Sequence, residues 1–100
     1  PLAGDVHSWH LYVIELGKSV AVSRDAFIDA MFAQGIGMSV HYIPLHQQSY
    51  WRDSCQLKAE DFPVSEALYQ STASLPIYTR MTDADVRRVA AAVRVALEAQ

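Results

Sequence analysis

The apolar residues of the chain fall into runs that predict three short strands. Residues 10–16 (HLYVIEL) are rich in β-branched and aromatic side chains, which is typical of a mostly buried strand. Residues 38–42 (MSVHY) predict a second strand, and Pro44 ends it because proline has no N–H to donate. Residues 75–78 (LPIY) predict a third strand, which its proline places at a sheet edge or at a strand end.

Elsewhere the apolar residues recur at helical spacing. The first predicted helix covers residues 26–34, with Ser23 as its N-cap and Gly35 where helices commonly end in the left-handed conformation. The apolar face of this helix consists of Phe27, Ile28, Met31 and Phe32. A second helix is predicted over residues 64–72, because Pro63 suits the first turn of a helix.

The last predicted helix follows Thr82 and Asp85, which resemble a capping box with aspartate in place of the usual glutamate or glutamine. Its apolar residues are Val86, Val89, Ala90, Val93 and Leu97. Residues 45–60 show little periodicity and predict a long irregular segment, which in a compact domain tends to be functional or mobile. The predicted order is therefore β-α-β-loop-α-β-α, an α/β (α+β) fold in which helices cover a small three-stranded sheet.

Composition and charge narrow the class of protein. The 100 residues suffice for a single domain, residues 1–100, and 51% hydrophobic with 19% charged residues is typical of a globular chain. The net charge of −3 provides no basic stripe for nucleic acid, and no apolar run approaches the roughly 20 residues that cross a membrane. The single cysteine, Cys55, excludes an internal disulfide and favours a reducing compartment such as the cytoplasm. The segment PLAGDVHSWH resembles no signal peptide and lacks an initiator methionine, which suggests a processed, trimmed or excised chain.

The stretch VHYIPLH, residues 40–46, carries the densest candidate chemistry. A zinc site needs about three or four ligands, whereas His41 and His46 lie five residues apart across a proline with no acidic neighbour, so metal binding is disfavoured. Cys55 lies in no recognised nucleophile motif, and a spectator thiol is the simpler interpretation. By periodicity alone the stretch is a strand that runs into a loop, and the residues themselves leave the function open.

Longer runs of the sequence resemble a known family. The runs RDAFIDAMFAQGIGMSVHYIPLHQQSYW and FPVSEALYQSTASLPIYTRMTDADVRRV, with HSWHLYVIEL before them, resemble the C-terminal part of the DegT/DnrJ/StrS family of pyridoxal-phosphate-dependent sugar aminotransferases. The resemblance covers nearly the whole chain; one departure is Met38, where the family often has threonine. It implies the C-terminal small domain of a fold-type-I pyridoxal-phosphate (PLP) enzyme.

The resemblance also implies an activity, a cofactor and partners. The family transfers an amino group, usually from glutamate, to a nucleotide-linked keto sugar, for lipopolysaccharide, capsule or glycoside synthesis, with PLP bound to a lysine. The chain has two lysines, Lys18 and Lys58, and neither lies in a segment that resembles the family's cofactor lysine. We therefore expect a chain without its large cofactor-binding domain, inactive alone and binding no cofactor by itself, that pairs as a homodimer.

Candidate substrate-binding residues follow from the same resemblance. His41 and Tyr42 match the family's HY and are expected to face the sugar or its phosphates, and His46 is expected to donate to a diphosphate. Tyr50, next to Trp51, is expected to stack on a nucleotide base or to pack in a lid, and His10 lies where the small domain is expected to meet the large one. Two alternatives stay open: a stand-alone binding or assembly module, and a PLP-dependent sugar dehydratase of the same family in which histidine replaces the lysine.

Overall fold

A helix pair forms the core of the computed structural model, which describes residues 2–98. Helix α1 (Arg24–Ala33) begins as predicted, with Ser23 Oγ accepting a hydrogen bond from Ala26 N at 3.2 Å, and Gly35 follows it in the left-handed conformation (φ +73°). Phe27 and Met31 on its inner face are completely buried. The helix thus begins and ends as its local sequence indicates, but Phe32, predicted on the same apolar face, is 75% exposed.

Helix α4 (Asp83–Glu98) lies against α1 and completes the core. The predicted capping box is confirmed, since Asp85 N donates to Thr82 Oγ1 at 3.2 Å and Thr82 N donates to the Asp85 carboxylate at 2.9 Å. The amide of Gln34, just after α1, donates to the carbonyl of Ala92 at 3.2 Å and ties the two helices together. The core between them consists of Val22, Phe27, Met31, Ile36, Val89, Ala92 and Ala96.

The sheet is smaller than the sequence predicts. Strands β1 (Tyr12–Glu15) and β2 (Thr72–Leu75) pair antiparallel, with Tyr12 opposite Leu75 and Glu15 opposite Thr72. The predicted strand at 38–42 contributes only an isolated bridge, in which Ser39 and Ser74 exchange backbone hydrogen bonds of 3.3 and 2.8 Å. Within the described residues the predicted three-stranded sheet is therefore a two-stranded sheet with one bridge beside it.

Two further strand predictions are corrected. The strand predicted at 75–78 lies earlier, and only Leu75 belongs to both, because Pro76 has no N–H with which to continue the ladder. The strand predicted to be mostly buried is half exposed, with Tyr12 at 49% and Val13 at 46% of their full accessibility. Apolar composition predicted this strand, but of its four residues only Ile14 packs against the core.

The predicted irregular segment, residues 45–60, contains helical structure, and together with α3 it forms an arm, defined here as residues 45–71. It begins with the 3-10 turn η1 (Leu45–Gln47), continues through α2 (Ser49–Cys55) and a second turn η2 (Ala59–Asp61), and ends with α3 (Pro63–Ser71). The observed order is β1-α1-η1-α2-η2-α3-β2-α4. The predicted helix at 64–72 corresponds to α3, one residue earlier at each end and with its proline at the start.

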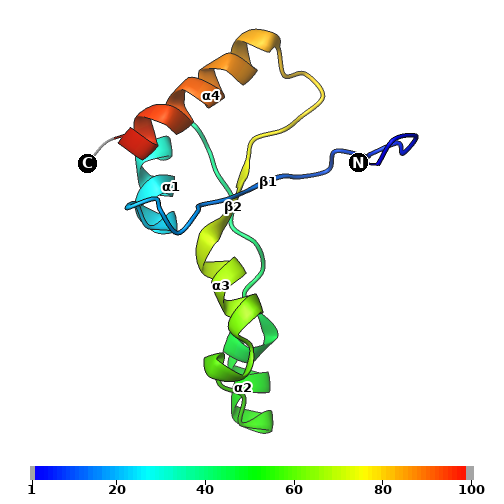
Figure 1. The fold of residues 1–100 in the computed structure, drawn as a ribbon, viewed down its shortest axis with the longest axis vertical. Coiled ribbons are helices and arrows are strands. Elements are labelled where there is room, and N and C mark those ends of the chain that lie inside the picture. Colours follow the sequence, from blue (N-terminus) through cyan, green and yellow to red (C-terminus); the bar gives the residue numbers. More distant parts are fainter. Residues whose placement is uncertain (1, 99–100) are drawn as a thin grey trace.

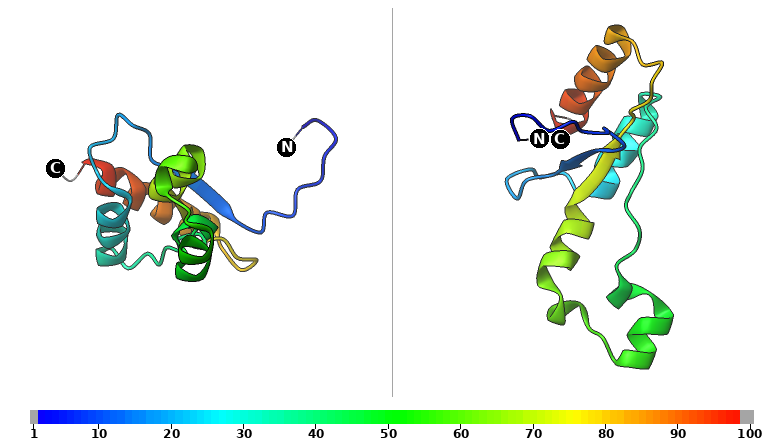
Figure 2. Two further views of the ribbon diagram at one scale, coloured as in Figure 1. Left: turned by 90° about the horizontal axis from the view of Figure 1, so that it is seen from below. Right: turned by 90° about the vertical axis from the view of Figure 1, so that its right-hand side faces the viewer.

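The arm projects away from the α1–α4 pair, as Figure 1 and the right-hand view of Figure 2 show. The radius of gyration is 16.2 Å, against roughly 13 Å for a compact domain of this length. No residue of α2 or α3 is buried, and both helices are described in full. None of the helices among residues 2–98 has both the length and the apolar character to cross a membrane.

Candidate functional site

The site is built around a bridge segment, residues 39–44, which runs from the sheet to the arm. Its upper end is fixed by the Ser39–Ser74 bridge and by His41, whose Nε2 lies 3.4 Å from Ser74 Oγ. Ser74 is buried, at 4% exposed, so the sheet supplies a fixed partner for the His41 ring. Tyr42, the next residue, is 98% exposed and extends from the segment into solvent.

His46 lies just past the bridge segment, in η1, and is buried. Its Nε2 is 2.7 Å from Glu66 Oε2, and the side chain of Gln47 donates to the same carboxylate oxygen at 2.7 Å. Gln70 donates to the other oxygen of Glu66 at 3.0 Å, and the ring of Phe62 stacks on the imidazole with centroids 5.1 Å apart. These five residues, His46, Gln47, Phe62, Glu66 and Gln70, are called the clasp below.

The clasp contains an ionised carboxylate. Hydrogen bonds from His46, Gln47 and Gln70, in that order of effect, lower the pKa of Glu66 to about 2. An ionised carboxylate only accepts hydrogen bonds, so the Nε2 of His46 carries the proton that they share. The side chain of His46 is 4% exposed, and its Nε2 is occupied. The predicted role of His46 as a donor to a diphosphate is therefore not supported by its position.

A wide main hollow of about 860 Å³ lies between the bridge segment and α3. His41, Tyr42 and Pro44 form one wall, and Phe62, Leu68 and Tyr69 contribute to the other. The lining is largely apolar and aromatic, with His41, Tyr42 and Asp61 among its residues with polar groups, which is the general composition of a small-molecule site.

The opposite side of the bridge segment lines a second hollow, of about 530 Å³. His10 and Leu11 face His41, Tyr42 and Ser74 there, so one segment presents the same two side chains to both hollows. Of the predicted site residues, His10, His41 and Tyr42 are thus brought together, while His46 lies behind the wall.

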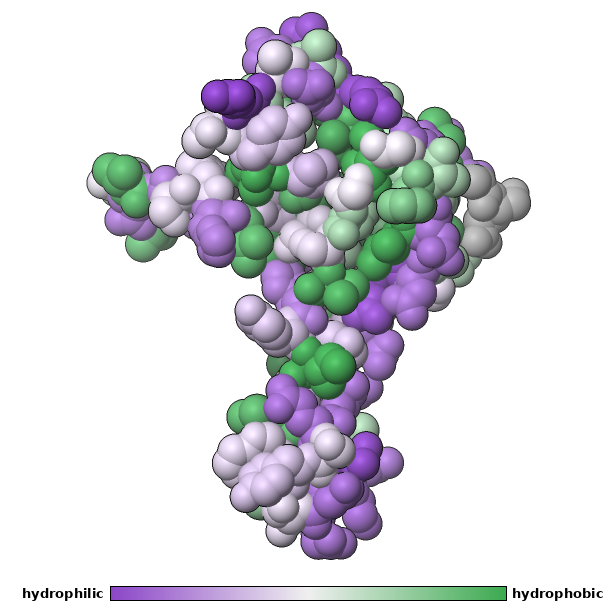
Figure 3. All heavy atoms as spheres, turned by 180° about the vertical axis from the view of Figure 1, so that it is seen from behind, coloured by the Kyte–Doolittle hydropathy of each residue, from purple (hydrophilic) through white to green (hydrophobic). Residues whose placement is uncertain are grey.

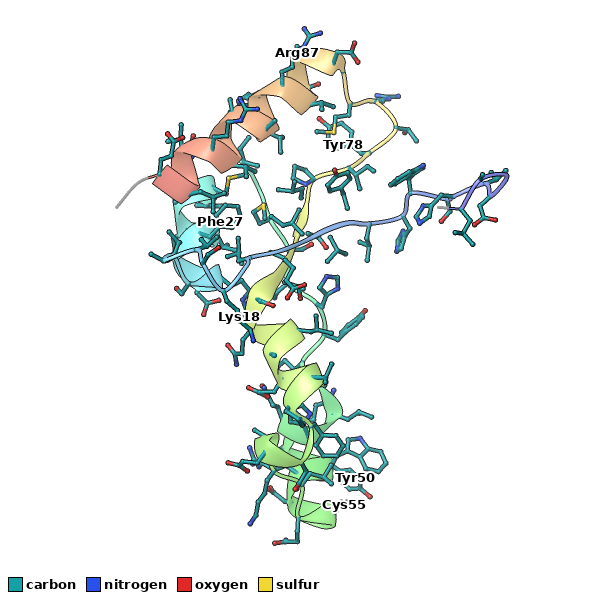
Figure 4. All side chains as sticks on the ribbon, viewed as in Figure 1. Lys18, Phe27, Tyr50, Cys55, Tyr78 and Arg87 are labelled. Carbon is teal, nitrogen blue, oxygen red and sulfur yellow. The ribbon has the colours of Figure 1, made fainter. Side chains whose placement is uncertain are left out.

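Tyr50 is apart from this group. It lies in α2 near the far end of the arm (Figure 4), is 69% exposed, and contacts Trp51 edge-on with ring centroids 5.2 Å apart. It lines neither the main nor the second hollow. The predicted contact of Tyr50 with a base stays a prediction.

Sequence reasoning missed Ser74, Phe62 and Glu66. Ser74 lies in β2, which was predicted three residues later in the sequence, and its partner His41 precedes it by 33 residues. Glu66 lies in the motif FPVSEAL, but nothing in the spacing relates it to His46, 20 residues earlier. Only the fold brings these pairs together.

A third hollow, of about 410 Å³, lies on the upper part of the molecule. It is lined mainly by apolar side chains, including Trp9, Tyr12, Leu75 and Ile77 of the strands and loops, and Val86 of α4. Figure 3 shows hydrophobic residues gathered over the middle of one face of the molecule. Exposed apolar surface of this kind marks a contact surface more often than a catalytic one.

Two solved structures share this fold. An aminotransferase of Helicobacter pylori, PseC, involved in the biosynthesis of pseudoaminic acid, superposes with a TM-score of 0.82 over 91% of this chain and 24% of its own, at 22% identity. A putative sugar aminotransferase of Streptococcus pneumoniae, solved in its PMP form, gives a TM-score of 0.78 over 90% of this chain and 22% of its own, at 22% identity. The fold is thus that of a part of such an aminotransferase.

The chain belongs to the DegT/DnrJ/EryC1/StrS aminotransferase family, whose sequence profile matches residues 1–94. It is 43% identical over 89 residues to the uncharacterized protein MJ1066 of Methanocaldococcus jannaschii, and 42% identical over 90 residues to the spore coat polysaccharide biosynthesis protein SpsC of Bacillus subtilis. Each match covers 88% of this chain and 23% of the relative. The chain therefore spans about a quarter of the length of these relatives.

The described residues do not form a complete site for PLP. A cofactor lysine must lie in a pocket beside partners for the pyridine ring and the phosphate. Lys18 and Lys58 are both exposed, the first in the turn after β1 and the second before η2, and neither lines a hollow described above. Residues 2–98 also contain no cluster of three or more metal-ligating side chains.

Proposed function

We propose that the chain is the C-terminal small domain of a PLP-dependent nucleotide-sugar aminotransferase that makes amino sugars for lipopolysaccharide, capsule or glycosides. One observation carries this proposal: in a member of an aminotransferase family, His41 and Tyr42 line both the main and the second hollow, and His10 lines the second hollow with them. The match to about a quarter of each relative supports the need for a large cofactor-binding domain. In this proposal the enzyme acts as a homodimer with glutamate as amino donor.

In this proposal, the role of this chain is to bind and orient the sugar substrate. The imidazoles of His10 and His41 and the phenol of Tyr42 offer hydrogen bonds to sugar hydroxyls and phosphates, and the apolar walls accept a base or a sugar face. PLP, held by the large domain, supplies the electron sink for amino transfer. The chain's own lysines take no part in this proposal.

The test is a kinetic comparison in the full natural polypeptide loaded with PLP, with glutamate and a nucleotide-linked keto sugar as substrates. We expect His41→Ala and Tyr42→Phe each to raise the KM for the sugar about tenfold, the loss of about one hydrogen bond to a charged group. His7→Ala and Tyr78→Phe are matched controls on exposed residues away from the bridge segment and should leave the KM unchanged.

Unchanged kinetics in both His41→Ala and Tyr42→Phe would contradict the proposal. Loss of a sugar hydroxyl without amino transfer would identify the dehydratase alternative. Absence of both reactions with several keto sugars would favour the stand-alone binding module.

A further inference from the structure

We infer that His46 is a positioning residue, which through the clasp holds the bridge segment at a fixed distance from α3 and so sets the shape of the main hollow. The inference rests on the proposed function, since it assigns His46 to substrate binding without substrate contact. It replaces the direct donation to a diphosphate expected from the sequence.

The geometry of the clasp is that of a two-sided anchor. His46 and Gln47 are consecutive residues of η1, and both reach the same oxygen of Glu66 at 2.7 Å. Gln70, one turn further along α3, holds the other oxygen at 3.0 Å, so the carboxylate is oriented from both sides. Phe62 covers the imidazole, its ring plane within 11° of parallel. A His ring fixed by one carboxylate and one aromatic face has little freedom to rotate.

The rest of the arm, residues 45–61, has few other attachments to α3. In the described part of the chain, the hydrogen bonds that join residues 45–61 to α3 all end on Glu66. The turn η1 and helix α2 contribute no buried apolar side chain to hold them in place. The clasp is therefore the specific contact that fixes where the lower end of the bridge segment lies.

The two histidines of the VHYIPLH stretch consequently act at opposite ends of one wall. His41 fixes the upper end at Ser74, and His46 fixes the lower end at Glu66. Tyr42 stands between these anchors and is 98% exposed, so its position depends on the anchors and not on packing of its own ring. Release of the lower anchor would let the wall move away from α3 and displace Tyr42.

The clasp lies outside the main core, so an effect of the clasp on the position of the bridge segment can be measured apart from an effect on the stability of the whole chain. None of its residues belongs to the α1–α4 core cluster. Loss of the clasp should therefore loosen residues 42–48 without unfolding the helix pair. Hydrogen exchange reports this local loosening independently of catalysis.

The experiment compares His46→Leu with His46→Gln in the full natural polypeptide loaded with PLP. Leucine fills space but has no N–H, whereas the glutamine amide keeps a donor for Glu66. We expect His46→Leu to speed amide exchange at residues 42–48 at least tenfold and to raise the KM for the sugar about tenfold, with kcat changed less than about threefold. His46→Gln should restore both readouts most of the way, and His7→Ala should alter neither.

Each other outcome is decisive. A higher KM for His46→Leu with unchanged exchange at 42–48 would mean direct substrate contact and would overturn the inference, as would no change in either readout. Faster exchange with unchanged kinetics would support the anchor and overturn the proposed substrate role of the main hollow. If His46→Leu does not fold, Gln47→Leu, which removes one of the two donors to Glu66 Oε2, is judged by the same readouts.

Discussion

The guanidinium of Arg24 lies over the ring of Tyr69, 4.8 Å from its centroid, and also donates to the Tyr69 carbonyl. Arg24 begins α1 and Tyr69 lies in α3, so this contact joins the helix-pair core to the arm. The Arg24 side chain is 10% exposed and pairs with Asp25 at 2.8 Å. A cation over an aromatic face is strongest when it is withdrawn from water in this way.

Substitution of Arg24 should weaken the attachment of the arm. We expect Arg24→Met to lower the free energy of unfolding by about 1–2 kcal/mol and to speed hydrogen exchange in α3, because both the cation–π contact and the hydrogen bond to the carbonyl are lost. Urea unfolding with exchange measurements checks this. Arg87→Met, on the exposed side of α4, is the control, and equal effects of the two changes would argue against a specific role for Arg24.

The two phenylalanines of α1 offer a matched test of the core. Phe27 is 0% exposed and Phe32 is 75% exposed on the same helix. Phe27→Ala should destabilise the chain by about 3–5 kcal/mol, because it leaves a cavity between α1 and α4. Phe32→Ala should change the stability by less than about 0.5 kcal/mol. Thermal unfolding of residues 1–100 measures both, and a similar loss for the two would mean that the core is placed wrongly.

The stabilising effect of the Glu66 carboxylate should be lost at acid pH. Its pKa is lowered from the ordinary 4.5 to about 2, chiefly by the hydrogen bond with His46. A carboxyl group whose pKa is depressed on folding stabilises the fold fully above its unfolded pKa, and this stabilisation is lost as the pH falls through the folded value. The stability difference between the wild type and Glu66→Gln should therefore shrink as the pH falls from 4.5 to about 2.

Urea unfolding at a series of pH values measures this difference. The exposed Glu60 provides the control, Glu60→Gln. A Glu66→Gln difference that stays constant down to pH 2 would contradict the hydrogen-bonded geometry of the clasp.

The chain by itself should not retain PLP. Lys18 and Lys58 are exposed and lie beside none of the hollows described above, so any cofactor that reacts with them is held by a single reversible bond and no pocket. After mixing with PLP and passage through a desalting column, residues 1–100 should elute without stoichiometric cofactor. Retention of one equivalent that Lys18→Arg or Lys58→Arg abolishes would reveal a cofactor site in this chain.

The parts of the fold that were predicted correctly have local causes. Ser23 caps α1, Gly35 ends it, and Thr82 with Asp85 starts α4, each through contacts within a few residues. Pro63 begins α3 for the same kind of reason. In these places a short stretch of sequence contains all the groups that decide the conformation.

The parts that were missed depend on distant partners. Residues 38–42 have strand composition, but within them only Ser39 pairs, with Ser74 of the distant strand β2. The sequence SYWRDSC of α2 has no buried face, so no apolar period indicated a helix. His46 is buried because Glu66 and Phe62 contact it, and these two residues approach it only when α3 packs against η1.

The pairing of β1 with β2 also determines the order in which the chain assembles. Tyr12 pairs with Leu75 and Glu15 with Thr72, so α1, α2 and α3 all lie within the loop that this small sheet closes. Closing a long loop lowers the entropy of the chain before any contact offsets the loss, so the strands pair slowly. A helix needs no such closure and forms in about a microsecond. We therefore expect the helices to form first and the sheet last. A newly made or refolding chain thus passes through a stage in which its helices exist while both strand edges are open to other chains.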